Sequence, residues 1–254
     1  MRQKEKGDKM ARFYPEKKTD MQRLYRRLHV DGRDDGKLRK QVDVLSKRAE
    51  EQTDIRVCYR MGEKVFQTGI PAVDACRVQI VCLVYAGDQP AAGGRSVCAV
   101  GDRPDGGGKP VCAAGDRLTA GGKLACVAEN QSETGKNNLL DLFFLDGIGS
   151  ERIFRASEQL NEYLAKYFCQ QGIFLTAPYF PGDGTVSLEC QRDLLEIIKE
   201  EEQVGVNISS GMMLVPEKSL LYAFGADENN KRRLWEHNCG QCHDFSCSFR
   251  SLNI

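Results

Sequence analysis

Three near-copies of a glycine-rich unit interrupt the patterned part of this 254-residue chain. Residues 90–103 read PAAGGRSVCAVGDR, residues 104–117 read PDGGGKPVCAAGDR, and residues 118–130 read LTAGGKLACVAEN. Each unit holds only one short apolar segment, which offers little surface to bury. We therefore expect residues 87–131 to form a flexible insertion or a small set of hairpins. The core must then come from the flanking parts, residues 19–86 and 132–236, as one domain with an insertion.

The part before the repeats shows two helical patterns and then two strand patterns. Apolar residues at steps of three or four predict a helical hairpin that turns around residues 31–35. Residues 55–59 and 78–85 are rich in β-branched and aromatic residues, which predicts strands. The residues that define the helical stripes are Met21, Leu24, Leu28 and Val30, then Leu38, Val42, Leu45 and Ala49.

The part after the repeats predicts two helices and a pair of strands. One helix has a buried stripe made of Ile153, Ala156, Leu160, Leu164 and Phe168. Just before it, Gly147 and Gly149 either allow a neighbouring segment to approach closely or break the helix. A second amphipathic helix carries Leu188, Leu194, Leu195 and Ile198. Residues 204–215 and 219–224 are then expected to pair as strands, turned at residues 216–218.

The charges of the chain are balanced, with 36 Lys and Arg against 36 Asp and Glu. No overall field draws it to nucleic acid or to an anionic membrane, so neither is expected as a partner. Residues 1–18 are an exception, and we expect them to form a basic, disordered arm. No apolar segment follows the early basic residues and nowhere do 18 apolar residues run together, so we expect a cytoplasmic protein.

Four segments, in order, carry a resemblance to a known family. Residues 145–150 (LDGIGS), residues 180–184 (FPGDG), residues 204–219 (VGVNISSGMMLVPEKS) and the Cys-rich end of the chain are similar to motifs of the cobalamin-dependent methionine synthase activation domain. The resemblance is to its free-standing, clostridial-type activation proteins. It covers residues 138–250 well and residues 20–85 loosely.

This resemblance implies an α+β fold in which helices cover an antiparallel β-sheet. It implies a module that binds S-adenosylmethionine and docks on a cobalamin-binding methionine synthase or related corrinoid protein, whose oxidised cobalt it helps to reduce and methylate. The cobalamin would be supplied by that partner, and a further protein could be the electron donor. The chain would then be an activation module of a methyltransferase rather than an independent enzyme.

The resemblance also implies which residues hold the methyl donor. In the turn these are Tyr179, Pro181, Gly182, Asp183 and Gly184, and in the later segment Ser210. Tyr179 stands near the position of the family's Arg, Asp183 at its Tyr, and Ser210 at its Glu. These differences leave an alternative open, a non-catalytic metal-binding interaction protein derived from the same module.

The tail, residues 237–254, has the spacing of metal ligands. Cys239, Cys242 and Cys247 form a Cys-x2-Cys-x4-Cys cluster, and His243 lies within it. A gap of two residues lets two thiolates converge on one zinc ion or one iron–sulfur cluster. A zinc ion would pin the tail, an iron–sulfur cluster would relay electrons, and free thiols on a mobile tail would do neither.

Metal analysis and visible absorbance of the anaerobically purified protein test whether the tail binds a metal. We expect the purified protein to contain stoichiometric metal that the Cys242→Ala variant loses, because that variant removes a central thiolate. Visible absorbance together with iron would identify an iron–sulfur cluster, and zinc without visible absorbance would identify a zinc site. Equal, negligible metal content in both proteins would instead mean free thiols.

Overall fold

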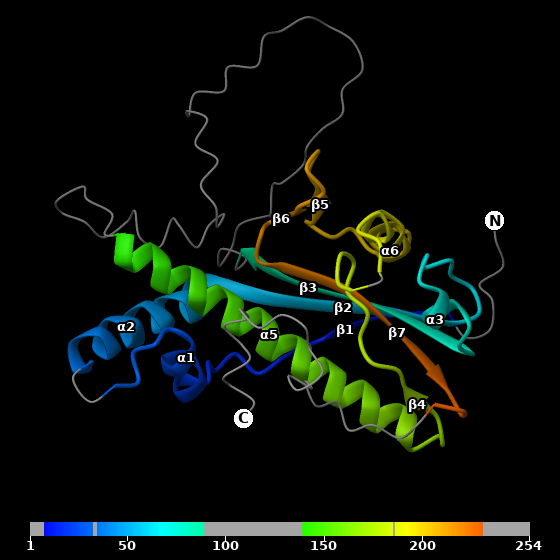
Figure 1. Ribbon diagram of the computed structural model, residues 1–254, viewed down its shortest axis with the longest axis horizontal. Helices are drawn as coiled ribbons and strands as arrows, with labels where there is room; N and C mark the ends of the chain where they lie inside the picture. The colour runs from blue at the N-terminus through cyan, green and yellow to red at the C-terminus, as the bar shows by residue number, and fades with distance from the viewer. Residues whose placement is uncertain (1–7, 33–34, 89–138, 185, 231–254) are drawn as a thin grey trace, which may run out of the picture.

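The computed structural model describes residues 8–32, 35–88, 139–184 and 186–230, and these residues form a five-stranded sheet with helices on both faces (Figure 1). The strands are β1 (Lys9–Phe13), β2 (Thr53–Glu63), β3 (Val78–Asp88), β4 (Phe174–Leu175), β5 (Asn207–Ile208), β6 (Leu214–Val215) and β7 (Ser219–Asp227). The helices are α1 (Met21–Arg27), α2 (Gly36–Gln52), α3 (Pro71–Asp74), α5 (Leu139–Cys169) and α6 (Cys190–Lys199).

The sheet is antiparallel throughout and has the order β1-β2-β3-β7-β4. Its centre is the pairing of β3 with β7, which runs from Val78 opposite Ala226 to Tyr85 opposite Ser219. The parts of the chain before and after the repeats therefore share one sheet. The α+β class and the antiparallel sheet expected from the sequence are confirmed.

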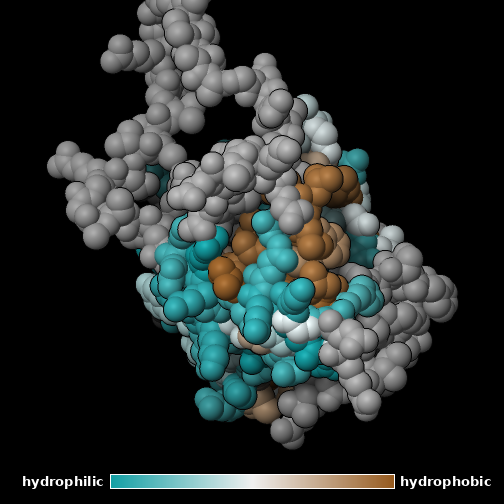
Figure 2. Space-filling model, turned by 90° about the vertical axis from the view of Figure 1, so that its left-hand side faces the viewer, coloured by the Kyte–Doolittle hydropathy of each residue, from teal (hydrophilic) through white to brown (hydrophobic). Residues whose placement is uncertain are grey.

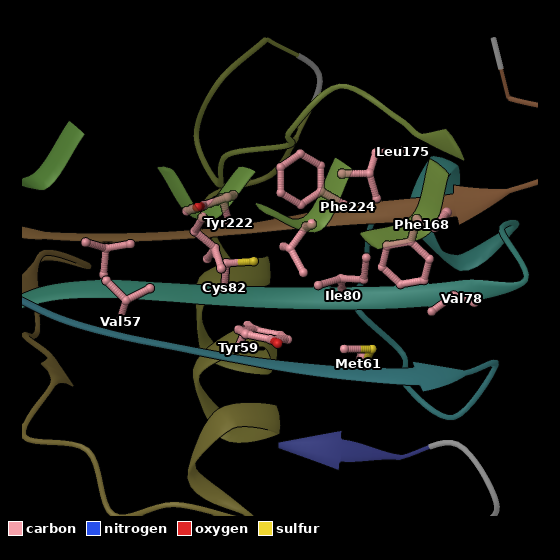
Figure 3. Close-up of a cluster of buried hydrophobic side chains, with 14 of the residues drawn as sticks. Val57, Tyr59, Met61, Val78, Ile80, Cys82, Phe168, Leu175, Tyr222 and Phe224 are labelled. Atoms are coloured by element: carbon pink, nitrogen blue, oxygen red, sulfur yellow. The ribbon is translucent and has the colours of Figure 1, made fainter. Parts of the chain in front are cut away.

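Helix α5 packs on one face of the sheet, and α6 packs on the other together with the short helix α3. Side chains at alternating positions of the central strands point to opposite faces, so Cys82 and Tyr222 belong to the cluster under α5 whereas Val81 belongs to the cluster under α6. Figure 3 shows the first of these clusters, in which Phe168 of α5 meets the strands. Because both faces are covered, residues 80–85 of β3 are buried without interruption.

One buried hydrogen bond joins α5 to the sheet. The hydroxyl of Tyr222, on β7, donates to Oδ1 of Asn161, on α5, over 2.9 Å. Both side chains are buried, so this bond satisfies two polar groups that water does not reach.

The helices before β2 pack against the first half of α5. Residues 21–27 and 36–52 form α1 and α2, so both expected helices are present. Their apolar stripes form a third cluster with Phe144, Leu145 and Ile148 of α5. Where α5 begins, Leu139 and Phe143 remain exposed, and the end of the molecule shown in Figure 2 has apolar surface among hydrophilic side chains.

Helix α5 runs through both glycines of the predicted break. It is continuous over 31 residues, and a Cβ added to Gly147 would lie 2.4 Å from Cδ2 of Leu28, the residue that follows α1. Of the two roles considered for these glycines, close approach is therefore the one that applies to Gly147.

The prediction that residues 1–18 form a disordered arm is wrong for residues 9–13. These residues form β1, which pairs with β2 from Lys9 opposite Met61 to Phe13 opposite Val57. The ring of Phe13 packs against Tyr163 of α5, with ring centroids 5.4 Å apart. The prediction relied on the charge of the segment and overlooked that only Lys9 and Arg12 are exposed, whereas the other three residues of the strand are partly buried.

The predicted pairing of residues 204–215 with 219–224 is also wrong. Residues 204–215 contain their own small hairpin, β5 with β6, and β7 pairs instead with β3 and β4. The reason is burial: the residues from Leu221 to Ala226 are all buried, which requires a neighbour on each side and a helix on each face.

In the described part of the chain, no helix has the length and apolar character needed to cross a membrane.

Substituting Gly147 tests the contact between α5 and Leu28. We expect Gly147→Val to lower the free energy of unfolding by about 1–3 kcal/mol, because the new side chain overpacks a buried site. Urea unfolding measures this change. The matched control is Gly36→Val, since an added Cβ at Gly36 meets nothing within 4 Å. Equal stability losses in the two variants would contradict a specific contact at Gly147.

Candidate functional site

The turn at residues 179–184 is fixed to the middle of the sheet. The amide of Tyr179 donates to the carbonyl of Ala223 on β7 over 2.9 Å, and the amide of Ala223 donates back over 3.0 Å. The Phe180 ring packs on Tyr222 with centroids 5.2 Å apart. The chain thus passes from the bridge between Tyr179 and Ala223 to an exposed turn within a few residues.

Two glycines give this turn its shape. Gly182 has φ 86° and Gly184 has φ 57°, values that favour glycine because a Cβ is strained there. The amide of Gly182 donates to the carbonyl of Val186 over 3.0 Å, and that of Asp183 to the carbonyl of Phe180 over 3.1 Å. The Asp183 side chain is exposed, so the turn presents a carboxylate beside two residues without side chains.

Ser210 lies on a separate element, the hairpin of β5 and β6. The Ser209 amide donates to the Met213 carbonyl over 2.8 Å, and Nε2 of Gln191 on α6 donates to the Met212 carbonyl over 2.8 Å. Ser210 itself is exposed. Among the described residues, hydrogen bonds anchor this hairpin to α6 and the turn to β7, and none joins Ser210 to the turn.

Two of the segments that carry the resemblance meet at Lys218. Its Nζ lies 2.5 Å from Oδ1 of Asp146 and donates to Oγ of Ser150 over 2.9 Å. Its backbone carbonyl accepts from the amide of Ala86 at the end of β3. The start of β7 is therefore tied to the LDGIGS segment of α5, although 72 residues separate Lys218 from Asp146.

A buried carboxyl group, Glu151 on α5, was not singled out from the sequence. Its side chain is 0% exposed, and its oxygens lie 3.2 Å from Nε of Arg23 and 3.7 Å from Nη1 of Arg27. Burial raises the pKa of Glu151 to about 7, although both arginines act in the opposite direction. The available signal was the position of Glu151, one helical turn after Ile148 on the buried face of α5.

The neighbouring residue, Arg152, has a structural role. Its guanidinium donates to the carbonyl of Ala49 over 2.7 Å and to that of Thr53 over 3.0 Å. These carbonyls belong to the end of α2, where a cation satisfies acceptors that lack helical partners. Arg152 thus fixes α2 to α5 beside Glu151.

The expected metal ligands Cys239, Cys242, His243 and Cys247 lie outside the described residues. Within the described ranges, no group of three His, Cys, Asp or Glu side chains could hold a metal ion. The cysteines there are free: Cys58, Cys76, Cys82 and Cys190 are buried, and Cys169 is half-buried. Burial raises the pKa of Cys58 to about 12, so it is a small apolar side chain rather than a thiolate.

Replacing Glu151 by Gln tests its buried titration. An unfolded Glu titrates near 4.5 and the folded one near 7, so the folded protein binds more protons between these values. Stability from this group is therefore greatest below the unfolded pKa and falls as pH rises through the folded pKa. Between about pH 5.5 and pH 8, the wild type should lose about 2 kcal/mol of unfolding free energy relative to Glu151→Gln, measured with urea.

The control for this experiment is Glu162→Gln, the same change at an exposed position of α5. Its stability should follow the wild type at every pH. A Glu151→Gln profile parallel to the wild type would show that the buried carboxyl does not titrate in this range.

No protein-family model matches the chain, and no curated protein matches it.

Proposed function

We propose that this is a cytoplasmic accessory protein that binds S-adenosylmethionine and supports reductive reactivation of cobalamin in a methionine synthase or related corrinoid methyltransferase. The observation that carries the proposal is the order of the four motif segments along one chain. The contact of Lys218 with Asp146 and Ser150 supports it, because it brings two of those segments together.

The turn at residues 179–184 is the proposed donor site. Its glycines let a ligand approach the main chain closely, since no side chain stands in the way. The carboxylate of Asp183 suits a donor that carries positive charge on its sulfonium and ammonium groups. Tyr179 and Pro181 are half-buried and hold the turn against the sheet, while Ser210 offers an exposed hydroxyl on the separate hairpin of β5 and β6.

The proposed role of these residues is to position the donor. S-adenosylmethionine would supply the methyl group that traps the partner's cobalt once an electron has reduced it, and S-adenosylhomocysteine would be released. Holding the methyl group in line with the acceptor lowers the entropic part of the barrier, which needs no side-chain nucleophile. The cobalamin belongs to the partner, because the sequence holds only three histidines and no Asp-x-His-x-x-Gly ligand motif.

A second candidate is a non-catalytic metal-binding interaction protein derived from the same module. The observation that favours it is the composition of the turn, where Asp183 replaces an aromatic residue and Tyr179 replaces a cation. The cysteine-rich tail would then be the functional part.

Calorimetric titration with S-adenosylmethionine separates the two candidates. We expect saturable heat with the wild type and binding weakened roughly tenfold or more by Gly182→Ala. The variant forces a Cβ into a left-handed backbone position at a strain of roughly 1–2 kcal/mol, and the Cβ would lie 3.2 Å from Cδ1 of Leu188.

The matched control is Gly172→Ala, which introduces similar strain at φ 72° after α5, with nothing within 4 Å of the new Cβ. It should bind S-adenosylmethionine as the wild type does. Absence of heat from the wild type at millimolar donor would overturn the proposal and leave the interaction protein.

A further inference from the structure

The two edges of the five-stranded sheet are built differently. One edge is β4, which is two residues long, and the chain that follows it contains Pro178 and Pro181, which have no N–H group to offer a further strand. The other edge is β1, which has five residues and no proline. Among the described residues, β1 pairs on one side only, with β2. An open edge of this kind is a template for pairing with another strand.

The charges of β1 do not protect this edge from pairing. Cations on an edge strand normally repel a second strand. The charge of Arg12 is offset, however, because its Nη2 lies 2.5 Å from Oε1 of Glu202. Lys9 is the only cation of the strand that lacks an ion-pair partner in the described part of the chain.

The sequence of β1 is complementary to itself when two copies run antiparallel with Ala11 on the two-fold axis. Lys9 then lies opposite Phe13 of the second copy. Met10 lies opposite Arg12 of the second copy, and Ala11 lies opposite itself. No like charges face each other, and each cation meets an aromatic or apolar side chain. The residue at the axis is small, so it does not hold the two strands apart.

The direction of the side chains places the aromatic residues on one face. Ala11 and Phe13 pack with the cluster under α5, whereas Met10 packs with the cluster under α6. Because successive side chains of a strand alternate, Lys9 points to the same face as Ala11. Pairing therefore brings Phe13 of the second copy to the α5 face, beside Lys9.

Two tyrosines of α5 are exposed over this edge. Tyr163 is 43% exposed, and its ring packs on Phe13 with centroids 5.4 Å apart. Tyr167, one helical turn later, is 37% exposed, and its ring centroid is 6.5 Å from that of Tyr163. Both rings therefore have surface that a second chain can cover.

Tyr167 lies toward the Lys9 end of β1. Phe168 is at the end of the strands where Met61 lies, as Figure 3 shows, and Met61 pairs with Lys9. Helix α5 thus runs from the level of Phe13 toward the level of Lys9. The exposed ring of Tyr167 is on the side that would receive Phe13 of the second copy.

We propose that β1 pairs with β1 of a second copy of this chain, about a two-fold axis at Ala11, so that the two sheets continue as one. Tyr167 of each copy packs near Phe13 of the other. The interface lies at the edge opposite β4 and the turn at residues 179–184, so the proposed donor site stays open. The proposal does not rest on the proposed function.

Sedimentation equilibrium of the full chain measures the assembly. We expect a concentration-dependent equilibrium between monomer and dimer. Tyr167→Glu should weaken dimerisation roughly tenfold or more, because it places a carboxylate beside an aromatic ring of the second copy. The matched control is Phe143→Glu, which also replaces an exposed aromatic ring of α5, 55% exposed, at the other end of the helix. It should dimerise as the wild type does.

Disulfide trapping tests the register and stays decisive if Tyr167→Glu does not fold. Only the residue on the axis lies directly opposite itself, with Cβ atoms about 4.5–5.5 Å apart. Ala11→Cys should therefore form an intermolecular disulfide under mild oxidation, whereas Lys9→Cys, two residues from the axis, should not. Peptide mapping distinguishes this bond from any bond of the 11 native cysteines.

Three results would overturn the proposal. They are a monomer at every concentration, a dimer that neither responds to Tyr167→Glu nor yields the disulfide of Ala11→Cys, and a disulfide that forms through Lys9→Cys instead. Binding of S-adenosylmethionine is measured separately and is expected to be unaffected by Tyr167→Glu. The two proposals can thus fail independently.

Discussion

The pairing of β3 with β7 is the constraint on which the rest of the structure depends. Both strands are buried on both faces, so their backbone N–H and C=O groups must find partners in neighbouring strands. That requirement brings together the two parts of the chain on either side of the repeats. It also demands a helix on each face, which α5 and α6 provide, and it presents β7 as the support on which the turn at residues 179–184 rests.

Local sequence patterns were sufficient to predict a helix or strand where the element is long and one of its faces is buried. The stripes of α1, α2 and α5 and the β-branched runs of β2 and β3 are of this kind, and all were predicted. Strand β1 was missed because its charge dominates five residues, while Phe13 reveals its packing only beside Tyr163. The pairing of β7 was mistaken because its partner, β3, lies more than 130 residues earlier, and no local pattern specifies so distant a neighbour.

The candidate site likewise has parts that the sequence predicted and parts that it did not. The turn around Gly182 and Gly184 was predicted from its composition, because left-handed positions require glycine. The isolation of Ser210 on its own hairpin was not predictable, since it follows from where α6 lies. Glu151 and Arg152 contact segments that are remote in sequence, so their positions on the buried face of α5 were the available signal. The tail ligands and the methyl-donor role stay predictions.

The turn at residues 179–184 begins with two residues that pack on opposite faces of the sheet. Tyr179 packs with the cluster under α6, whereas the next residue, Phe180, packs with the cluster under α5 and against Tyr222. The first residues of the turn therefore touch both layers of the protein. A ligand at the turn would rest on a support that is shared by both faces.

The bond from Tyr222 to Asn161 has a consequence for the whole of α5. A helix turns by about 100° per residue, so sliding α5 by one position would swing Asn161 away and leave a buried phenol without an acceptor. The bond therefore fixes the rotation of the 31-residue helix α5 about its own axis. Glu151 lies on the same helix, ten residues before Asn161. The direction in which its carboxyl group points thus depends on a bond at the centre of the sheet.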